Sequence, residues 1–291
     1  MKKIDLHMHT LISDGTDSLE EIIKKVREEG LDLFSVTDHD SIKAGIMVPS
    51  MLKAIPSEKR TPFIRGVEFS CEDEIGKYHI LGYGYDPTVH GIAEVVFAGQ
   101  EMRTKKTSAR LDFLKDEFGF EFSKEEIQEL LTKDNPGKPH IANLMIKHGY
   151  ATDIKEAITE YIDKKHFDNA HVRPEQAIEG ILKSGGIPIL AHPTYGDGDD
   201  LILGDDMDLR LRHLMEFGIE GVEAYYSGFS PKIQEEVLGF AEKYDLYVTA
   251  GSDYHGENKM VDLGWTNLED VNDGPAGLKR FLQDVDMAIV K

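Results

Sequence analysis

Short apolar segments that end in histidine or in a carboxylate recur along this chain. The first runs through Ile4 and Leu6 to His7 and His9, and Asp14 follows shortly after it. In an extended segment, side chains two residues apart point to the same side, so His7 and His9 can reach one ion together. Two histidines at this spacing also arise by chance. A metal site is better supported because later apolar runs end in the same way, at His39, at Glu68, at His79, at His192, and at Asp253 with His255.

Helix-forming segments separate these apolar runs. Ser18 can cap a helix over residues 19–29, with Glu20 and Glu21 in the first turn and Gly30 after the end. After a first strand that ends at Leu6, strands are expected at 33–37, 63–69, 78–83, 187–191, 221–226 and 246–252, and the strand at 78–83 is close enough to its predecessor to be a hairpin partner. Alternation of this kind predicts an α/β fold with a mostly parallel sheet and right-handed crossovers.

The pattern changes between residues 91 and 170, where strand signals vanish and helical periodicity takes over. Helices are expected at 102–118, 124–131, 140–148 and 154–161. The region has the size of a small domain. We therefore predict that residues 1–90 and 171–291 form one barrel domain with the metal centre. Residues 91–170 are expected to form an all-helical insertion that covers the active site.

Composition limits the classes of partner. The chain has 33 basic and 54 acidic residues, a formal charge of −21, which disfavours binding to DNA or to an anionic membrane. A phosphorylated substrate remains possible, because bound divalent cations invert the local field. The single cysteine, Cys71, permits no internal disulfide, and no apolar stretch approaches the length that spans a bilayer. We expect a cytoplasmic enzyme, with the oligomeric state left open.

The polar residues at the strand ends predict a metal centre. In a barrel of parallel strands, the C-terminal strand ends share one rim, where active sites are built. Nitrogen and oxygen donors without thiolate favour zinc, manganese or iron, and nine donors imply two or three divalent ions. A single residue such as His79 could be a hydrogen-bonded core histidine, but burying the whole set without ions would cost too much. The set is His7, His9, Asp14, His39, Glu68, His79, His192, Asp253 and His255.

The motifs around these residues resemble those of the PHP (polymerase and histidinol phosphatase) family, in the family's order and over most of the chain. The resemblance implies a distorted seven-stranded (β/α) TIM-like barrel that holds three metals, usually manganese, iron or zinc. The motifs are Asp5-Leu6-His7-Met8-His9, Thr37-Asp38-His39-Asp40, Gly66-Val67-Glu68-Phe69-Ser70, His79-Ile80-Leu81-Gly82-Tyr83, Ala191-His192-Pro193 and Gly251-Ser252-Asp253-Tyr254-His255.

The resemblance also implies how the ligands are shared. His7, His9, Glu68 and Asp253 would hold one ion; Glu68, His79 and His192 the second; and Asp14, His39 and His255 the third. Some family members place histidine where Asp14 stands. A hydroxide held between metals by Glu68, His9 and Asp253 would attack phosphorus, while the ions stabilise charge on the phosphoryl oxygens. The chain is thus expected to be a phosphoric monoester hydrolase.

The helical insertion resembles that of PHP phosphoesterases acting on nucleoside 3′,5′-bisphosphates or on short RNA. In those proteins an Arg-Pro-His sequence opens an insertion helix, and here the sequence is Lys138-Pro139-His140. Lysine offers a point charge instead of a bidentate fork. A helix N-terminus with adjacent cations suits a phosphate, although Pro139 could equally serve only to start the helix. We expect Lys138, His140 and Arg110 to clamp a second phosphate of a small nucleotide.

Further roles are assigned by position alone. Tyr226 and Ser227 lie near the rim and could touch the substrate, which would be a nucleoside bisphosphate or monophosphate. Asp40 and Glu223 could orient metal-binding histidines, or could be ordinary strand-end or capping residues. Three alternatives stay open: a 5′–3′ exoribonuclease on short RNA, a histidinol-phosphatase-like enzyme, and a non-catalytic metal-binding regulatory module. The last normally requires lost ligands, and every expected position is kept.

Overall fold

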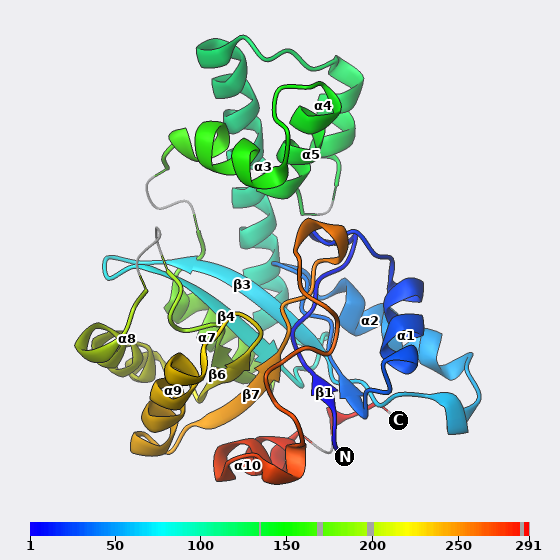
Figure 1. Cartoon of the computed structure of the whole chain (residues 1–291), viewed down its shortest axis with the longest axis vertical. Coiled ribbons are helices and arrows are strands. Elements are labelled where there is room, and N and C mark those ends of the chain that lie inside the picture. The colour runs from blue at the N-terminus through cyan, green and yellow to red at the C-terminus, as the bar shows by residue number, and fades with distance from the viewer. Residues whose placement is uncertain (134, 168–170, 197–200, 286–287, 291) are drawn as a thin grey trace.

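The computed structural model describes residues 1–133, 135–167, 171–196, 201–285 and 288–290, and it places a mixed α/β body below a helical part (Figure 1). The strands of the described residues form a two-stranded sheet, β1-β2, and a five-stranded sheet in the order β3-β4-β5-β6-β7. Their bounds are β1 Ile4–Asp5, β2 Leu33–Phe34, β3 Gly66–Glu72, β4 Lys77–Tyr83, β5 Ile187–Leu190, β6 Gly221–Tyr226 and β7 Tyr247–Gly251.

The larger sheet is mixed instead of mostly parallel. Strand β4 runs antiparallel to both of its neighbours, β3 and β5, whereas β5, β6 and β7 are parallel. The reason is the connection between β3 and β4, which spans only residues 73–76 and is too short for a crossover. The hairpin expected from the sequence is therefore present. Strand β3 begins at Gly66 and not at residue 63, since Phe63 makes only isolated bridges to Phe34 and Val290.

The two sheets meet at both of their edges. The amide of Leu6, just after β1, donates to the carbonyl of Ala250 in β7 at 2.9 Å. At the other edge, His39 forms an isolated parallel bridge with Glu68 of β3. The ladders are interrupted at these junctions, so the expected seven-stranded (β/α) barrel is not confirmed as one continuous closed sheet.

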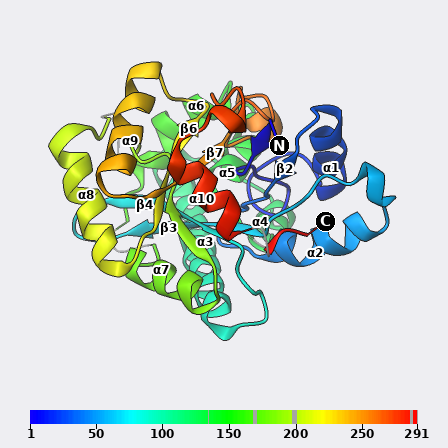
Figure 2. The ribbon, with the colours of Figure 1, turned by 90° about the horizontal axis from the view of Figure 1, so that it is seen from below.

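Helices surround the strands, as Figure 2 shows from below. Helix α1 illustrates why: Leu19, Ile22, Ile23 and Val26 form one buried stripe, and Ser18 starts the helix with a capping box. The helices are α1 Leu19–Glu28, α2 Lys43–Lys53, α3 His90–Phe118, α4 Lys124–Leu131, α5 Lys138–Lys147, α6 Ile154–Glu156, α7 Pro174–Lys183, α8 Gly204–Phe217, α9 Pro231–Lys243 and α10 Ala276–Asp284. Among the described residues, no helix combines the length and apolar character needed to cross a membrane.

Helix α3 is longer than its sequence pattern indicates, because it starts at His90 instead of near residue 102. Its first half packs on α7. At this crossing a Cβ on Gly180 would meet Val95 and the carbonyl of Gly91, so only glycine permits the close approach. Helix α3 then rises out of the lower body and carries the upper helices, as Figure 1 shows. One continuous helix thus connects the two parts.

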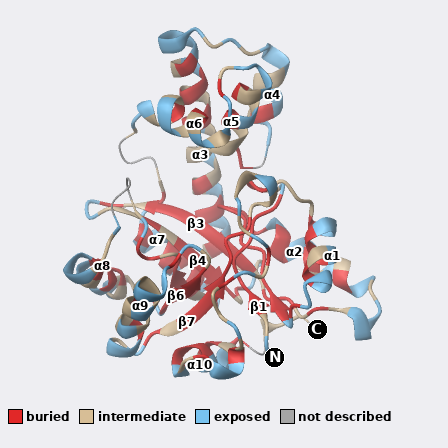
Figure 3. Cartoon of the chain, in the orientation of Figure 1, coloured by how far each residue is buried: buried red, intermediate tan, exposed pale blue. Residues whose placement is uncertain are grey.

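The buried residues fall into separate clusters (Figure 3). Two clusters lie in the lower body among the strands and the helices around them. A third contains Leu114, Ile141, Met145, Ala157 and Ile162, all between residues 111 and 162. Our proposal that residues 91–170 form one helical insertion rests on this separate core. Its expected end, at 168–170, lies outside the described residues.

Candidate metal centre

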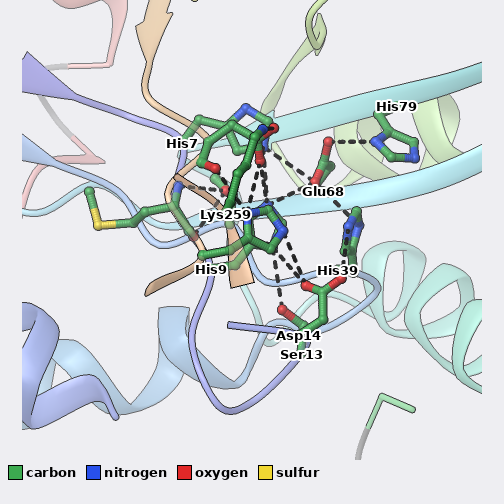
Figure 4. Close-up of polar contacts among 12 residues, drawn as sticks. His7, His9, Ser13, Asp14, His39, Glu68, His79 and Lys259 are labelled. Atoms are coloured by element: carbon green, nitrogen blue, oxygen red, sulfur yellow. Dashed lines mark hydrogen bonds and ion pairs between the residues drawn. The ribbon is translucent and has the colours of Figure 1, made fainter. Parts of the chain in front are cut away.

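Glu68 lies at the centre of the polar cluster, and Figure 4 shows it among His7, His9, His39 and His79. Its side chain is almost fully buried on β3. Oε2 lies 3.3 Å from His7 Nε2, 3.1 Å from His9 Nε2 and 3.2 Å from His39 Nδ1. Oε1 lies 2.9 Å from His79 Nδ1 and 3.2 Å from His192 Nε2. One carboxylate therefore touches residues from four further segments of the chain.

Asp14 is the centre of a neighbouring group. Its Oδ1 lies 3.6 Å from His9 Nδ1 and 3.4 Å from His255 Nε2, and its Oδ2 lies 3.8 Å from His39 Nε2. Asp253 joins the two groups, since its Oδ1 lies 3.3 Å from His9 Nε2 and 3.4 Å from His255 Nδ1. The structure thus brings all nine predicted ligands together. Glu68 and His79 lie within strands β3 and β4, however, and not past their ends.

These residues fit divalent cations. Several of their buried atoms have no hydrogen-bond partner in acceptable geometry, among them Glu68 Oε2, Asp14 Oδ1 and the Nδ1 atoms of His39, His79 and His192. Short distances without hydrogen-bond geometry are expected where lone pairs converge on a shared point. Four sets have donor atoms within 4.8 Å of one another: His9, Asp14, His39 and His255; His7, His192 and Asp253; His7, His9 and Glu68; and His39, Glu68 and His79.

The electrostatics of the cluster favour bound cations. Burial alone would raise the pKa of Glu68, but the surrounding His7, His39 and His79 hold that pKa well below its ordinary value. Conversely, burial alone would lower the pKa of His9, yet Asp253, Glu68 and Asp14 outweigh burial and raise it to about 9. Carboxylates and imidazoles buried together therefore retain positive charge between them, as protons or as metal ions.

Buried groups behind the ligands hold them in place. Glu223 lies 2.9 Å from His7 Nδ1 through Oε1, and its Oε2 accepts from the amide of His192 at 2.9 Å. This leaves His7 Nε2 free to face the cluster. Asp38 accepts from the Thr10 amide at 2.7 Å and from Ser13 Oγ at 2.7 Å, which fixes the loop leading to Asp14. Contacts of this kind set ring orientation and ligand basicity.

Three residues in and beside the cluster have a left-handed backbone. The φ angles are 47° at Asp40, 25° at His192 and 57° at Asp253. This region is costly for residues other than glycine, and it persists only where the surrounding structure enforces it. At Asp253 the bend turns Oδ1 toward the histidines, while Oδ2 accepts from Tyr226 Oη at 3.0 Å and from Lys259 Nζ.

The predicted substrate-binding residues differ in the partners that they contact. Tyr226 Oη contacts Asp253, whereas Ser227 Oγ donates to the carbonyl of Ser252 at 2.7 Å. Lys138 pairs with Asp163 at 2.5 Å and is partly exposed. His140 accepts from the amide of Gly137 at 3.1 Å, and burial, followed by nearby cations, lowers its pKa to about 4.

Two other predicted residues, Arg110 and Asp40, are not part of the lining of the cavity at the cluster. Arg110 is buried on α3, with its guanidinium 5.1 Å from the ring of Phe167. Asp40 pairs with Arg103 Nε, and its described contacts include no histidine ring. Of the two residues predicted to orient histidines, Glu223 contacts His7 directly, whereas Asp40 contacts the cluster through its backbone amide, which donates to the carbonyl of Glu68 at 2.8 Å.

Sequence reasoning missed three cations near the cluster. Arg103 contacts Asp40 and donates from Nη2 to Ser70 Oγ at 2.6 Å. Lys106 is buried one turn further along α3. Arg103, Lys106 and Arg110 are spaced as i, i+3 and i+7, so they share one face of the helix. This spacing is visible in the sequence and could have marked Arg103 and Lys106 as a group with Arg110. Lys259 contacts Asp253 from a loop, and no local pattern marks it.

A cavity of about 340 Å³ opens on the cluster. Its polar lining includes ligands predicted for the metals together with Asn258 and Lys259. Its apolar lining comes from the lower body and from the helical part alike. The lining residues are His39, Glu68, His79, Pro139, Ile154, Ile158, His192, Tyr195, Tyr226, Asp253, His255, Asn258 and Lys259.

Comparison with known proteins gives a family and several relatives. The family described as PHP domain matches residues 5–172. A phosphoribosyl 1,2-cyclic phosphate 1,2-diphosphodiesterase of Eggerthella lenta is 27% identical, over 87% of this chain and 94% of that protein. A 5′-3′ exoribonuclease of Haemophilus influenzae is 26% identical, over 90% and 93%. A 3′,5′-nucleoside bisphosphate phosphatase of Chromobacterium violaceum is 26% identical, over 91% and 92%.

A solved structure has the same fold. It is described as an amidohydrolase from Chromobacterium violaceum with bound sulfate, and it superimposes with a TM-score of 0.84. The similarity covers 99% of this chain and 97% of that chain at 22% identity. Lower body and helical part are therefore both included in the shared architecture.

Proposed function

Because the chain belongs to the PHP domain family, we propose that it is a metal-dependent phosphoesterase that hydrolyses a phosphate monoester of a small nucleotide. A nucleoside 3′,5′-bisphosphate is the proposed substrate, in line with the relative from Chromobacterium violaceum. The observation that carries the proposal is the position of Glu68. Its carboxylate lies within 3.3 Å of five imidazoles and belongs to two of the four ligand sets.

The proposed fold of the catalytic part is a distorted seven-stranded barrel. Both junctions between the sheets support it: the hydrogen bond from Leu6 to Ala250 on one side, and the bridge between His39 and Glu68 on the other. Strand ends around such a ring bring distant segments to one rim. This explains how His7 and Asp253, from opposite ends of the chain, come to share one site.

Two or three divalent ions, manganese, iron or zinc, are the proposed cofactors. When bound, such ions supply a water of lowered pKa and neutralise charge on phosphoryl oxygens. The chain's own residues would hold and orient them. Glu68 would contribute to more than one ion, and Glu223 contacts His7 Nδ1, so that Nε2 of this ring is left for an ion. Asp253 is held by Tyr226 and Lys259 through one oxygen, which leaves Oδ1 for the cluster.

The second phosphate of the substrate is proposed to bind on the helical side. Arg103 of α3 contacts Asp40, and the buried Lys106 lies one turn further along the same helix. A Cβ on Gly137 would make van der Waals contact with Arg103 Nη1 at 3.6 Å. Lys138 and His140 begin α5 directly after this glycine. Arg103 supplies the planar fork that Lys138 lacks. Arg110 is proposed to support this group from behind.

A second candidate function is a 5′–3′ exoribonuclease, as in the Haemophilus influenzae relative. The observation in its favour is a further open hollow of about 510 Å³. Asp17, Lys25, Tyr254 and Met260 contribute to its lining, and Lys259 lines both this hollow and the cavity at the cluster. A strand longer than one nucleotide would have room to continue past Lys259.

The test is metal analysis combined with a substrate panel. The protein is stripped with a chelator, reloaded with manganese, iron or zinc, and assayed with a nucleoside bisphosphate, a nucleoside monophosphate, a ribose cyclic phosphate, a labelled oligoribonucleotide and histidinol phosphate. We expect metal-dependent release of inorganic phosphate from the bisphosphate. Glu68→Gln should lose this activity, and the exposed Glu58→Gln should keep it. Full activity after chelation would overturn the proposal, and a ladder of shortened oligonucleotides would favour the exoribonuclease.

A further inference from the structure

The cavity at the cluster has apolar residues in its lining that phosphate and metal binding do not explain. On the lower body these are the rings of Tyr195 and Tyr226, and on the helical part they are Pro139, Ile154 and Ile158. A phosphate and a ribose are polar and would leave this surface without a matching partner. Both parts of the molecule contribute, so a ligand in the cavity touches the strand side and the helical side together.

Tyr195 is held as a fixed ring with an exposed surface. Its hydroxyl donates to the carbonyl of Gly228 at 3.3 Å. Its ring packs against Phe229, with centroids 6.2 Å apart and planes 23° apart, and lies edge-on to Tyr226 at 5.9 Å. Yet 41% of the residue remains exposed. A ring that is oriented by its neighbours and open on the cavity side can stack with little loss of conformational freedom.

The isoleucines come from an unusual segment. Ile154 begins α6, and Ile158 lies in the π-helical turn Ala157–Tyr161 that follows. Both are half-buried and pack on the core of the helical part. A π-helical turn widens the backbone and is often found at functional sites. Ile158 of this turn lines the cavity from the helical part, whereas Tyr195 lines it from the loop after β5, so the cavity has a second apolar surface.

The polar side chains along this part of the cavity are already engaged. Asn258 donates from Nδ2 to the carbonyl of Asp14 at 2.7 Å, and its Oδ1 accepts from Asn143 at 3.3 Å. Lys259 contacts Asp253 and Tyr226. Among the described residues, the apolar end of the cavity therefore offers stacking and apolar contact in place of free hydrogen-bonding groups.

From these contacts we propose that Tyr195, Ile154 and Ile158 form a slot that holds the nucleobase of the substrate by its faces, without reading its edges. This inference rests on the proposed nucleotide phosphoesterase function, and it names the residues that would bind the base of the substrate. A flat aromatic ring is the part of a nucleotide that suits such a surface, since every base has a π-face. It follows that different bases should bind with similar affinity, and that a sugar phosphate without a base should bind more weakly.

The test compares a nucleoside 3′,5′-bisphosphate with its abasic tetrahydrofuran analogue. The variants are Tyr195→Ala and Tyr195→Phe, with the exposed Phe97→Ala outside the cavity as control. We expect Tyr195→Ala to raise KM for the nucleotide about tenfold with kcat held, because stacking on one aromatic ring is typically of this size. The abasic analogue should be unaffected, and Tyr195→Phe and Phe97→Ala should stay within about twofold of the parent.

Binding to the metal-free protein, measured by calorimetry, separates this proposal from the function on which it rests. If neither compound is hydrolysed, the proposed function fails, while a weaker Kd of Tyr195→Ala for the nucleotide alone still supports the slot. Equal losses for both compounds, or no loss in either measurement, would overturn the slot. Discrimination among adenine, guanine, cytosine and uracil nucleotides by more than about a hundredfold would exceed what stacking supplies and would also count against it.

Discussion

Replacement of Lys106 by methionine should stabilise the metal-free protein. Lys106 is 8% exposed, and within the described residues it makes no hydrogen bond or ion pair. Burial, followed by the charges of Arg103 and Arg110, lowers the pKa of its amine to about 6. At pH 7 the amine is therefore protonated in the unfolded chain and largely neutral in the folded one. The proposed role of this residue, binding a phosphate, explains why such an unfavourable group is kept.

The magnitude follows from the pKa difference. From an unfolded value of 10.5 down to pH 7, at 1.36 kcal/mol per unit, the upper limit is about 5 kcal/mol. Local rearrangement and water entry offset part of this, and replacement of buried ionisable groups by apolar ones is worth about 1–4 kcal/mol in practice. We expect Lys106→Met to gain within that range at pH 7. The exposed neighbour Lys105→Met should change stability by less than about 0.5 kcal/mol.

The pH dependence gives the sharper test. Unfolding of the parent takes up a proton on Lys106 between pH 6 and pH 10.5, so its stability rises with pH over that interval. The variant lacks this uptake. Its advantage should be largest at pH 6 and below, and should shrink by up to about 1.4 kcal/mol per unit as the pH rises. Below pH 6 the difference should stay constant, because Lys106 is then charged in both states.

The assay is urea unfolding of parent, Lys106→Met and Lys105→Met in chelator at pH 6, 7, 8 and 9. Titration of the cluster histidines is common to all three proteins and cancels in the differences. Addition of inorganic phosphate should stabilise the parent more than Lys106→Met, since the anion restores the charge of the amine. Parallel stability curves for parent and Lys106→Met across this pH range would refute the assignment of Lys106 as a buried, unpaired amine.

Three further outcomes are expected. Glu223→Gln should weaken metal binding about 10–100-fold in a chelator competition, because it disturbs the orientation of a proposed ligand, whereas the exposed Glu216→Gln should leave it unchanged. Glu68→Ala or His255→Ala should abolish turnover with the circular dichroism spectrum retained, and wild-type turnover by either variant would contradict the shared cluster. Lys138→Ala should mainly raise KM, because the lysine is proposed to bind the substrate's second phosphate and not the reacting one. Unchanged kinetics on every substrate would exclude it from the clamp.

The polar cluster could be predicted from the sequence because each of its parts is marked by a local pattern. A histidine or a carboxylate at the end of an apolar run is visible without tertiary information, and strand geometry then brings His7 and His9 to one side. Convergence of the nine side chains followed from the expected strand arrangement. The direction of β4 and the hairpin with β3 were visible in the short connection between them.

What the sequence did not reveal depends on contacts between distant segments. The charge run on α3 looked like an exposed face, and only the folded structure shows that Lys106 and Arg110 are buried. The first turns of α3 pack closely against Gly180 of α7, which lies far away in sequence. Similarly, Asp40 finds its partner in Arg103, 63 residues further along the chain.

The left-handed backbone at Asp40, His192 and Asp253 lowers the stability of the fold, while the side chains at these positions belong to the proposed site. Glycine would relieve about 1–2 kcal/mol of backbone strain at each position, while deleting a charged or metal-directed side chain. A mutant library screened only for solubility or thermal resistance would therefore tend to accept glycine there. Such a library would drift toward well-folded, inactive chains unless the selection also demanded turnover.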